Sequence, residues 1–337
     1  MISVWVCIFG FLMVSCQSMI ENQVINGLNR QHTEWLNDGK LHVILVGSGG
    51  PFNNTERVST STAIIAGGEF LVFDAGEGSA RSADLNDLPL GQLSAVFLTH
   101  FHSDHIADLG ELNFASWVNG RTKNLDVYGP IGVDKVVKGF AQVYEEDTKY
   151  RVLHHGKDIM NPNSSLMVAK PFSTPDVKVA ALIFDRNGLK VWAFTVDHFP
   201  VEPAVGYRIE YKGNIVVLTG DTKKIETLSF HAKGADILVS EALSFKLVSR
   251  IEKVARENQR PRIAKIMKDI PDYHMTPVQA AEVAQKAGAK KLVFNHIAPP
   301  ITNFMAKRIF LDGVDDVFDG DVELGKDGMT FVLDPKP

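Results

Sequence analysis

Cysteine is nearly absent from this chain of 337 residues, and its two copies, Cys7 and Cys16, both lie within the first sixteen positions. From residue 17 onward the chain has no thiol that could act as a nucleophile, bind a metal or form a disulfide. Without this leader, the chain could fold in an oxidising compartment without mispaired disulfides. Any metal site further along the chain is restricted to imidazole and oxygen ligands.

Charged side chains are missing from the first twenty residues, which include an apolar run at positions 4–14. The run is shorter than the about twenty residues that span a bilayer as a helix. It resembles the apolar core of a secretory signal, although a basic residue near its start is lacking. Met13-Val14-Ser15-Cys16 resembles an imperfect bacterial lipobox. We expect residues 1–18 to be a signal peptide or lipoprotein signal, and the protein to be exported, either periplasmic or anchored to a membrane by lipid at Cys16.

Internal repeats and low-complexity tracts are also lacking, and 45% hydrophobic against 22% charged residues is the balance of a globular protein. The net charge of −5 argues against attraction of the whole surface to nucleic acid. Residues 19–40 are polar and are expected to be a lead-in. We expect residues 41–337 to form a single domain.

Apolar runs of strand length, rich in Val, Ile and Phe, recur along this domain. They lie at 41–46, 62–66, 70–73, 95–99, 125–128, 177–184, 189–196, 204–211, 215–219, 237–239, 292–294 and 329–333. Helical patterns lie between them at 106–118, 133–144, 244–257 and 277–287. This order favours two sheets with helices outside over a Rossmann fold. The glycines of Gly47-Ser48-Gly49-Gly50 are a weak dinucleotide signal, because no helix pattern begins directly after them.

The segment Thr99-His100-Phe101-His102-Ser103-Asp104-His105 carries the densest chemistry and directly follows an apolar run. Three histidines and one carboxylate fall within six residues. A segment that leaves the end of a strand can turn these side chains inward together. Imidazole and carboxylate groups suit zinc or another borderline divalent ion.

This segment resembles the HxHxDH motif of the metallo-β-lactamase-fold hydrolases. Asp74-Ala75-Gly76, Asp197-His198, Gly220-Asp221 and Asn295-His296 match the remaining pieces of that pattern in order. The resemblance runs from about Leu41 to the end of the chain and implies an α/β fold, the four-layer αββα sandwich of this family.

Within the superfamily the chain most resembles the branch that contains ribonuclease Z and the zinc-dependent arylsulfatases. The residues that carry this finer resemblance are Pro203-Ala204-Val205-Gly206-Tyr207-Arg208, Ser240-Glu241-Ala242 and Tyr273-His274-Met275-Thr276-Pro277.

The resemblance implies two Zn²⁺ ions, with Mn²⁺ or Fe²⁺ as alternatives. It assigns His100, His102 and His198 to the first metal, Asp104, His105 and His296 to the second, and Asp221 to a bridging position.

Three further roles follow from the same resemblance. His274 would protonate the leaving group or stabilise negative charge on the transferring centre, and Glu241 could orient His274. With Asp104, these two are the expected catalytic residues. Asp74 would brace a histidine or the loop beneath the site.

The substrate is less constrained than the metal site. Ribonuclease Z usually carries a long tRNA clamp between the equivalents of His198 and Asp221. Only twenty-two residues separate these two positions here, and they are typical of a strand pair with a turn at Lys212-Gly213-Asn214. Between Lys246 and Lys268, eight basic and two acidic residues form a patch that would concentrate anionic substrates.

We therefore expect a metal-bound hydroxide to attack a small anionic ester, either a phosphodiester or an aryl sulfate, with no stable nucleic-acid partner. β-Lactamase or lactonase activity on the same two-metal site is an alternative, as is a ribonuclease Z-type endonuclease. An oxidoreductase is disfavoured because His102 and His105 stand where such members commonly have one glutamate. A non-catalytic binding protein is disfavoured because all seven ligands are present. A homodimer is left open.

Overall fold

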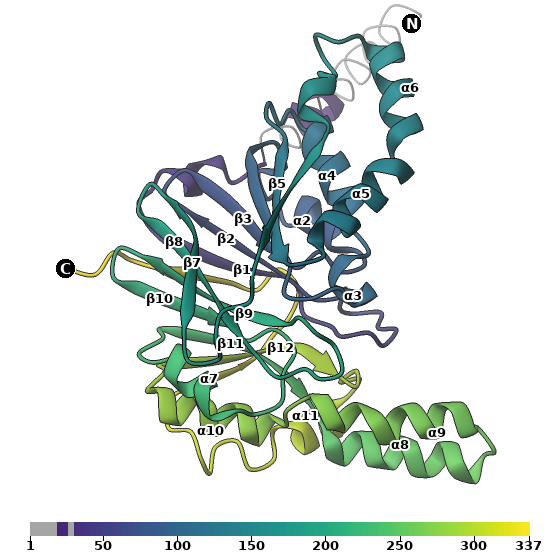
Figure 1. The fold of residues 1–337 in the computed structure, drawn as a ribbon, viewed down its shortest axis with the longest axis vertical. Helices are drawn as coiled ribbons and strands as arrows, with labels where there is room; N and C mark the ends of the chain where they lie inside the picture. Colours follow the sequence, from purple (N-terminus) through teal and green to yellow (C-terminus); the bar gives the residue numbers. More distant parts are fainter. Residues whose placement is uncertain (1–18, 26–29) are drawn as a thin grey trace, which may run out of the picture.

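The computed structural model describes residues 19–25 and 30–337 (Figure 1). The predicted signal at 1–18, including Cys16, lies outside the described residues. Within the part of the chain that is described, no helix is both long and apolar enough to cross a membrane.

Two seven-stranded sheets form the centre of the molecule. The first sheet contains, in spatial order, β14 (Thr330–Leu333), β1 (Leu41–Gly47), β2 (Ser61–Ala66), β3 (Glu69–Phe73), β4 (Leu93–Phe97), β5 (Leu125–Pro130) and β6 (Met167–Phe172). The second contains β13 (Asp321–Leu324), β12 (Lys291–Ala298), β11 (Ile237–Leu243), β10 (Asn214–Leu218), β9 (Val205–Tyr211), β8 (Leu189–Thr195) and β7 (Ala180–Arg186). Because β14 pairs with β1, the last strand closes on the first.

Three apolar cores define four layers. One core lies between the sheets and joins β1, β2 and β4 to β8, β9 and β10. A second lies between the first sheet and α2 (Ser79–Leu85), α4 (Leu109–Val118) and α5 (Val133–Val143). The third lies between the second sheet and α7 (Glu226–His231), α10 (Pro277–Ala287) and α11 (Phe304–Leu311). The predicted αββα sandwich is therefore confirmed (Figure 1).

Strand direction brings the candidate residues together. β3, β4, β5 and β6 run parallel in the first sheet, and β10, β11, β12 and β13 run parallel in the second. The carboxyl ends of parallel strands meet at one edge, where the connecting loops can converge on a ligand. The segments that follow β3, β4 and β10 carry Asp74, the histidine-rich motif and Asp221, respectively.

One helix that the sequence predicts is divided into two shorter helices in the structure. Residues 106–118 were expected to form a single helix, whereas α3 (Ser103–Ile106) ends before α4 begins at Leu109. The interruption allows the backbone N–H of Asp108 to donate to the Ala75 carbonyl at 2.9 Å, while the Ala75 N–H donates to the His105 carbonyl at 2.7 Å. These two bonds tie the motif loop to the end of β3.

Three helices stand away from the sandwich. α6 (Glu145–His155) buries none of its residues and projects at the opposite end of the molecule from the other two (Figure 1). α8 (Phe245–Glu257) and α9 (Pro261–Asp269) form a hairpin that projects from the body below the label of α3 (Figure 1). α9 passes through the short helix η4 (Ile270–Tyr273) into α10. Thr276 and Gln279 form a capping box at the start of α10, a favourable helix N-terminus.

Candidate metal centre

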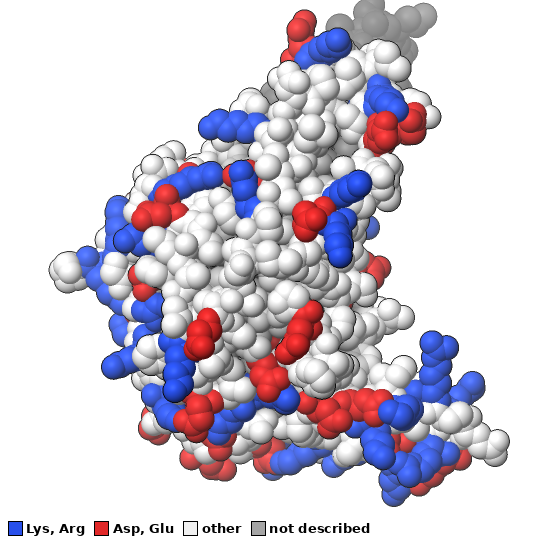
Figure 2. Space-filling view, in the orientation of Figure 1, with Lys and Arg blue, Asp and Glu red and all other residues white. Residues whose placement is uncertain are grey.

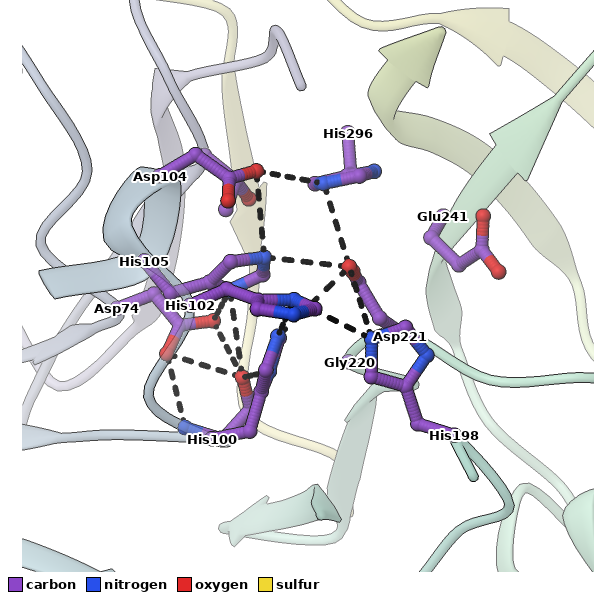
Figure 3. A network of polar contacts seen from close by, with 12 residues as sticks. Asp74, His100, His102, Asp104, His105, His198, Gly220, Asp221, Glu241 and His296 are labelled. Carbon is purple, nitrogen blue, oxygen red and sulfur yellow. Dashed lines mark hydrogen bonds and ion pairs between the residues drawn. The ribbon is translucent and has the colours of Figure 1, made fainter. Parts of the chain in front are cut away.

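The seven predicted ligands converge from both sheets (Figure 3). They come from the segment after β4 with the short helix α3, from the loops after β8 and β10, and from β12 itself. The structure brings them together in two groups, each with its candidate ligand atoms within 4.8 Å of one another. The first group is His100, His102, His198 and Asp221, and the second is Asp104, His105 and His296. Only His102 and Asp104 are half-buried, so the centre reaches solvent on their side.

Asp221 lies between the two groups. Its Oδ2 atom is 3.3 Å from His105 Nε2 and 3.3 Å from His296 Nε2. The same oxygen is 3.9 Å from the Nε2 atoms of His100 and His198. One carboxylate thus faces ligands of both groups, which is the arrangement that a bridging ligand requires.

Beneath the centre, Asp74 and Thr99 orient two histidines. Asp74 Oδ2 lies 2.9 Å from His105 Nδ1, and Asp74 Oδ1 accepts the Thr99 backbone N–H at 2.8 Å. The Thr99 hydroxyl donates to Asp74 and lies 3.0 Å from His100 Nδ1. Because the Asp74 carboxylate holds the Nδ1 proton, Nε2 is the nitrogen of His105 that would bind a metal once the ring is neutral.

Asp74 and His296 both have positive φ values, 59° and 46°. Such a backbone conformation costs free energy in a residue other than glycine, and it concentrates at functional sites. At Asp74, the contacts to Thr99 and His105 hold the residue in place.

The outer histidines are oriented by different acceptors. His198 Nδ1 lies 2.9 Å from the Tyr273 carbonyl, which leaves Nε2 facing the first group. His274 Nδ1 lies 3.2 Å from Glu241 Oε1, and the same oxygen accepts the Met275 backbone N–H at 3.0 Å. His274 also forms a cluster of potential ligands with Asp221 and His296. Glu241 belongs to none of the potential metal-binding groups among the described residues, and His274 is the candidate site residue that it contacts.

The pKa values follow from burial and from the neighbouring carboxylates. Burial lowers the pKa of His198 to about 4 and that of His100 well below its ordinary value. Burial opposes protonation of His105 and His296 too, but nearby carboxylates outweigh it. Asp221, Asp74 and Asp104 raise the pKa of His105 well above its usual range, and Asp221 with Asp104 raises the pKa of His296 to about 9. Burial raises the pKa of Asp104, but His105 and His296 together bring it down to about 2.

A divalent metal fits this donor set. The Oδ1 atom of Asp221 is buried and makes no hydrogen bond to any residue that the structure describes. A buried charged oxygen without a partner is costly, and a metal ion would satisfy it. His100 Nε2 and His102 Nδ1 face each other at 3.0 Å. Imidazole nitrogens and carboxylate oxygens that converge in this way are typical zinc ligands.

Some functional contacts could not be read from the sequence. Tyr273 acts through its backbone carbonyl, which carries no signal of residue type. Two glycines are close-packing positions: a Cβ on Gly50 would lie 3.1 Å from the His296 ring, and one on Gly76 would lie 2.2 Å from the Asp104 carbonyl. Gly50, after β1, therefore packs against the His296 ring, and Gly76, after β3, packs against the backbone of Asp104.

Comparisons with known proteins agree with this arrangement. A family model described as "Beta-lactamase superfamily domain" matches residues 70–297, which include every candidate ligand and His274. Ribonuclease Z of Mycobacterium bovis (strain BCG / Pasteur 1173P2) is 35% identical over 268 residues, covering 77% of this chain and 87% of that protein. Ribonuclease Z of Mycobacterium marinum is 33% identical over 264 residues, covering 77% and 88%.

Solved structures share the fold at lower identity. A metallo-beta-lactamase fold protein from Bacillus subtilis superposes with a TM-score of 0.61 at 19% identity, covering 87% of this chain and 99% of that chain. The short form of human tRNase Z superposes with a TM-score of 0.60 at 20% identity, with the same coverage.

The expectation of a small anionic substrate and no nucleic-acid partner is contradicted by the relatives, which are named as ribonucleases. β9 and β10 do pair antiparallel, which confirms the strand pair predicted where ribonuclease Z usually has its clamp. The absence of a clamp concerns one position in the fold, however, and the net charge of −5 is a sum over the whole chain. Neither describes the surface beside the site, so neither excludes RNA.

Proposed function

The chain belongs to the beta-lactamase superfamily, and from this premise we propose that it hydrolyses phosphodiester bonds of RNA with two zinc ions. Relatives named ribonuclease Z, at 35% identity over 77% of the chain, support RNA as the substrate. The proposal depends mainly on the position of Asp221, whose carboxylate faces both groups of candidate ligands. His274 lies beside Asp221.

Two bound zinc ions would lower the pKa of a water molecule between them and neutralise charge on the phosphate. The chain would hold the first with His100, His102 and His198, and the second with Asp104, His105 and His296. Asp221 would offer one carboxylate to both. Asp74 keeps the Nδ1 proton of His105 in place, so that His105 binds as a neutral imidazole.

His274 is the proposed proton donor. Glu241 Oε1 accepts a hydrogen bond from His274 Nδ1 at 3.2 Å, so Nε2 of His274 is free to face the phosphate. Cleavage of an RNA phosphodiester releases a ribose oxygen, which is a poor leaving group unless a proton reaches it. A histidine held beside the metal ligands supplies that proton in the transition state. Glu241 is a positioning residue in this account.

The zinc-loaded protein should cleave a 3′-extended tRNA precursor or an unstructured RNA, and EDTA should abolish the cleavage. Bis(p-nitrophenyl) phosphate and p-nitrophenyl sulfate share one leaving group, so their ratio isolates the preference for phosphorus or sulfur. We expect the phosphodiester to react faster. Faster cleavage of the sulfate, with both RNAs left intact, would exclude the proposal.

A further inference from the structure

The α8–α9 hairpin carries a concentration of positive charge that the chain as a whole does not have. Residues 246–268 hold eight basic and two acidic residues, a net charge of +6, whereas the whole chain carries −5. Figure 2 shows Lys and Arg side chains gathered over the projecting hairpin, with acidic side chains among them. The hairpin therefore differs in sign from the remainder of the molecule.

Half of these cations have no partner. The side chains of Arg250, Arg260, Arg262 and Lys268 are exposed and make no hydrogen bond or ion pair with any residue in 19–25 or 30–337. The other four pair with acidic residues across the surface, as Lys265 does with Asp269. Exposed pairs of this kind are weak and are screened by salt, so they leave the positive field of the hairpin largely intact.

The spacing of the basic residues gives each helix a cationic face. Lys246, Arg250 and Lys253 recur at i, i+4 and i+7 in α8, and Arg262, Lys265 and Lys268 recur at i, i+3 and i+6 in α9. Residues at these intervals share one side of a helix. The opposite sides carry the buried residues, among them Val248 and Met267.

The base of the hairpin is continuous with the metal centre. α8 begins two residues after β11 ends at Leu243, and Glu241 lies in that strand. α9 leads through η4 to Tyr273, whose carbonyl contacts His198, and then directly to His274. A small apolar cluster that includes Leu243, Val248 and Met267 fixes this base. A polyanion that lies along the hairpin therefore arrives beside the proposed proton donor.

We propose that the α8–α9 hairpin is an RNA-binding arm, which holds the phosphate backbone of the substrate outside the metal centre. This inference rests on the proposed function, since it assumes that RNA is the polyanion. The arm leaves the fold between β11 and α10, and not between His198 and Asp221, where only the β9–β10 turn is found. Its cations are separate from every residue assigned to catalysis.

An anionic membrane is the competing partner. The hairpin also exposes Ile251, Val254, Ile263 and Ile266, and basic helices with exposed apolar residues can lie on membranes. RNA is favoured because the arm joins the loop of His274. Contacts to the substrate backbone would therefore position the scissile bond, whereas a membrane would not.

The test uses the full chain with Arg250→Gln, Arg260→Gln, Arg262→Gln and Lys268→Gln combined. The matched control changes four other exposed cations that lack ion pairs, Arg81→Gln, Lys138→Gln, Lys157→Gln and Lys178→Gln. Binding of a labelled 3′-extended tRNA precursor is measured in EDTA over a range of KCl concentrations. Hydrolysis of bis(p-nitrophenyl) phosphate is measured with zinc.

The arm variant should bind RNA at least about tenfold more weakly, with a log–log salt slope reduced by about 2 to 3. The control should bind within about twofold of the parent, and both variants should keep the parent rate on the small phosphodiester. Equal RNA affinity in the arm variant, or no RNA binding by the parent, would overturn the inference. So would loss of binding to phosphatidylglycerol vesicles with RNA affinity unchanged.

The two proposals fail separately. If the parent binds RNA through the arm but does not cleave it with zinc, the proposed function fails and the arm remains. If the parent and the arm variant bind and cleave RNA equally well, the function stands and the arm is wrong.

Discussion

Asp74 lies beneath the candidate metal centre and contacts His105 Nδ1, which leaves Nε2 of His105 facing the centre. Its carboxylate accepts from Thr99 and lies 2.9 Å from His105 Nδ1. Partners of this kind typically change metal affinity by about 10- to 100-fold when they are removed. Such residues are as important to the centre as the ligands themselves.

Asp74→Asn should weaken zinc binding by about 10- to 100-fold because the amide keeps the shape but loses the charge that polarises His105. Asp38→Asn is the matched control. Asp38 makes the same kind of contact, 2.8 Å from Oδ2 to His42 Nε2, but His42 is not a candidate ligand. Competition with a zinc chelator measures both affinities. The same affinity in both variants would show that Asp74 only braces the loop.

His274→Ala should reduce kcat on RNA by about 10²- to 10⁴-fold while both zinc ions remain bound. The loss on bis(p-nitrophenyl) phosphate should be much smaller, because p-nitrophenolate leaves without a proton. The measurement is the ratio of the two losses, together with zinc content by mass spectrometry. Equal losses on both substrates would contradict a role in protonating the leaving group.

Zinc binding should release protons and strengthen as pH rises. In the metal-free protein, neighbouring carboxylates raise the pKa of His105 well above its ordinary value and that of His296 to about 9, although burial opposes both. Both are therefore protonated at pH 7, and zinc binds only the neutral forms. Affinity should increase as pH rises from 7 through about 9, where His296 loses its proton. Calorimetry in buffers of different ionisation enthalpy should show about two protons released at pH 7; no release would be inconsistent with these two ligands.

Raised pKa values also affect the stability of the metal-free protein. The pKa of His296 is about 9 in the folded protein and near 6.5 in the unfolded chain, so its protonation stabilises the fold fully below pH 6.5. This contribution is lost as pH rises through 9. Metal-free protein should thus lose stability over the range in which zinc binding becomes stronger.

At the scale of secondary structure, the segments after β3 and β4 hold Asp104 and His105 in place. Gly76 follows β3, and a Cβ there would lie 2.2 Å from the Asp104 carbonyl and 2.6 Å from Ser59 Cβ. These neighbours belong to α3, which carries two ligands, and to the segment that leads into β2, so neither can move without disturbing the site.

Gly76→Ala should lower both the melting temperature and the zinc content, with a cost of about 1 to 3 kcal/mol from overpacking. Gly139→Ala is the control, because Gly139 lies within α5 with nothing within 4 Å of an added Cβ. That change should stabilise the helix by up to about 1 kcal/mol. Thermal unfolding and metal analysis distinguish the two, and an unchanged Gly76→Ala protein would refute the packing argument.

The strands and helices that the sequence predicts are those with strong apolar patterns. β1 and β3 are buried along their whole length, and α10 has a capping box and a glycine stop. β6 is half-exposed at a sheet edge and contains Pro171, and β13 is four residues long with two acidic side chains. α9 is short, basic and begins at a proline. β6 and β13 are held by β5 and β12, which are remote in sequence, and α9 is held by packing at the base of the α8–α9 hairpin, so local patterns do not reveal them.

The candidate ligands were predictable because four of them fall within six residues and the others follow in a familiar order. The orienting contacts were only partly predictable. Asp74 and Glu241 have side chains that suggest a bracing role, whereas the Tyr273 carbonyl and the bridging geometry of Asp221 exist only after both sheets have packed.

Considered as a whole, the molecule has a buried candidate metal site and a projecting cationic hairpin on a body that carries net negative charge. Such a distribution focuses anions at one end, which whole-chain charge does not reveal. The export signal at residues 1–18 and lipid at Cys16 stay predictions. If they hold, the proposed RNA substrate would be one that the protein meets outside the cytoplasm.

The central claim is that a zinc-loaded site cleaves RNA phosphodiester bonds. The most direct measurement incubates the full-length, zinc-loaded protein with an end-labelled 3′-extended tRNA precursor, with an Asp221→Ala variant prepared in parallel. We predict discrete cleavage by the parent, none in EDTA and none by the variant. An intact RNA in the presence of two bound zinc ions, or equal cleavage by the variant, would contradict the account.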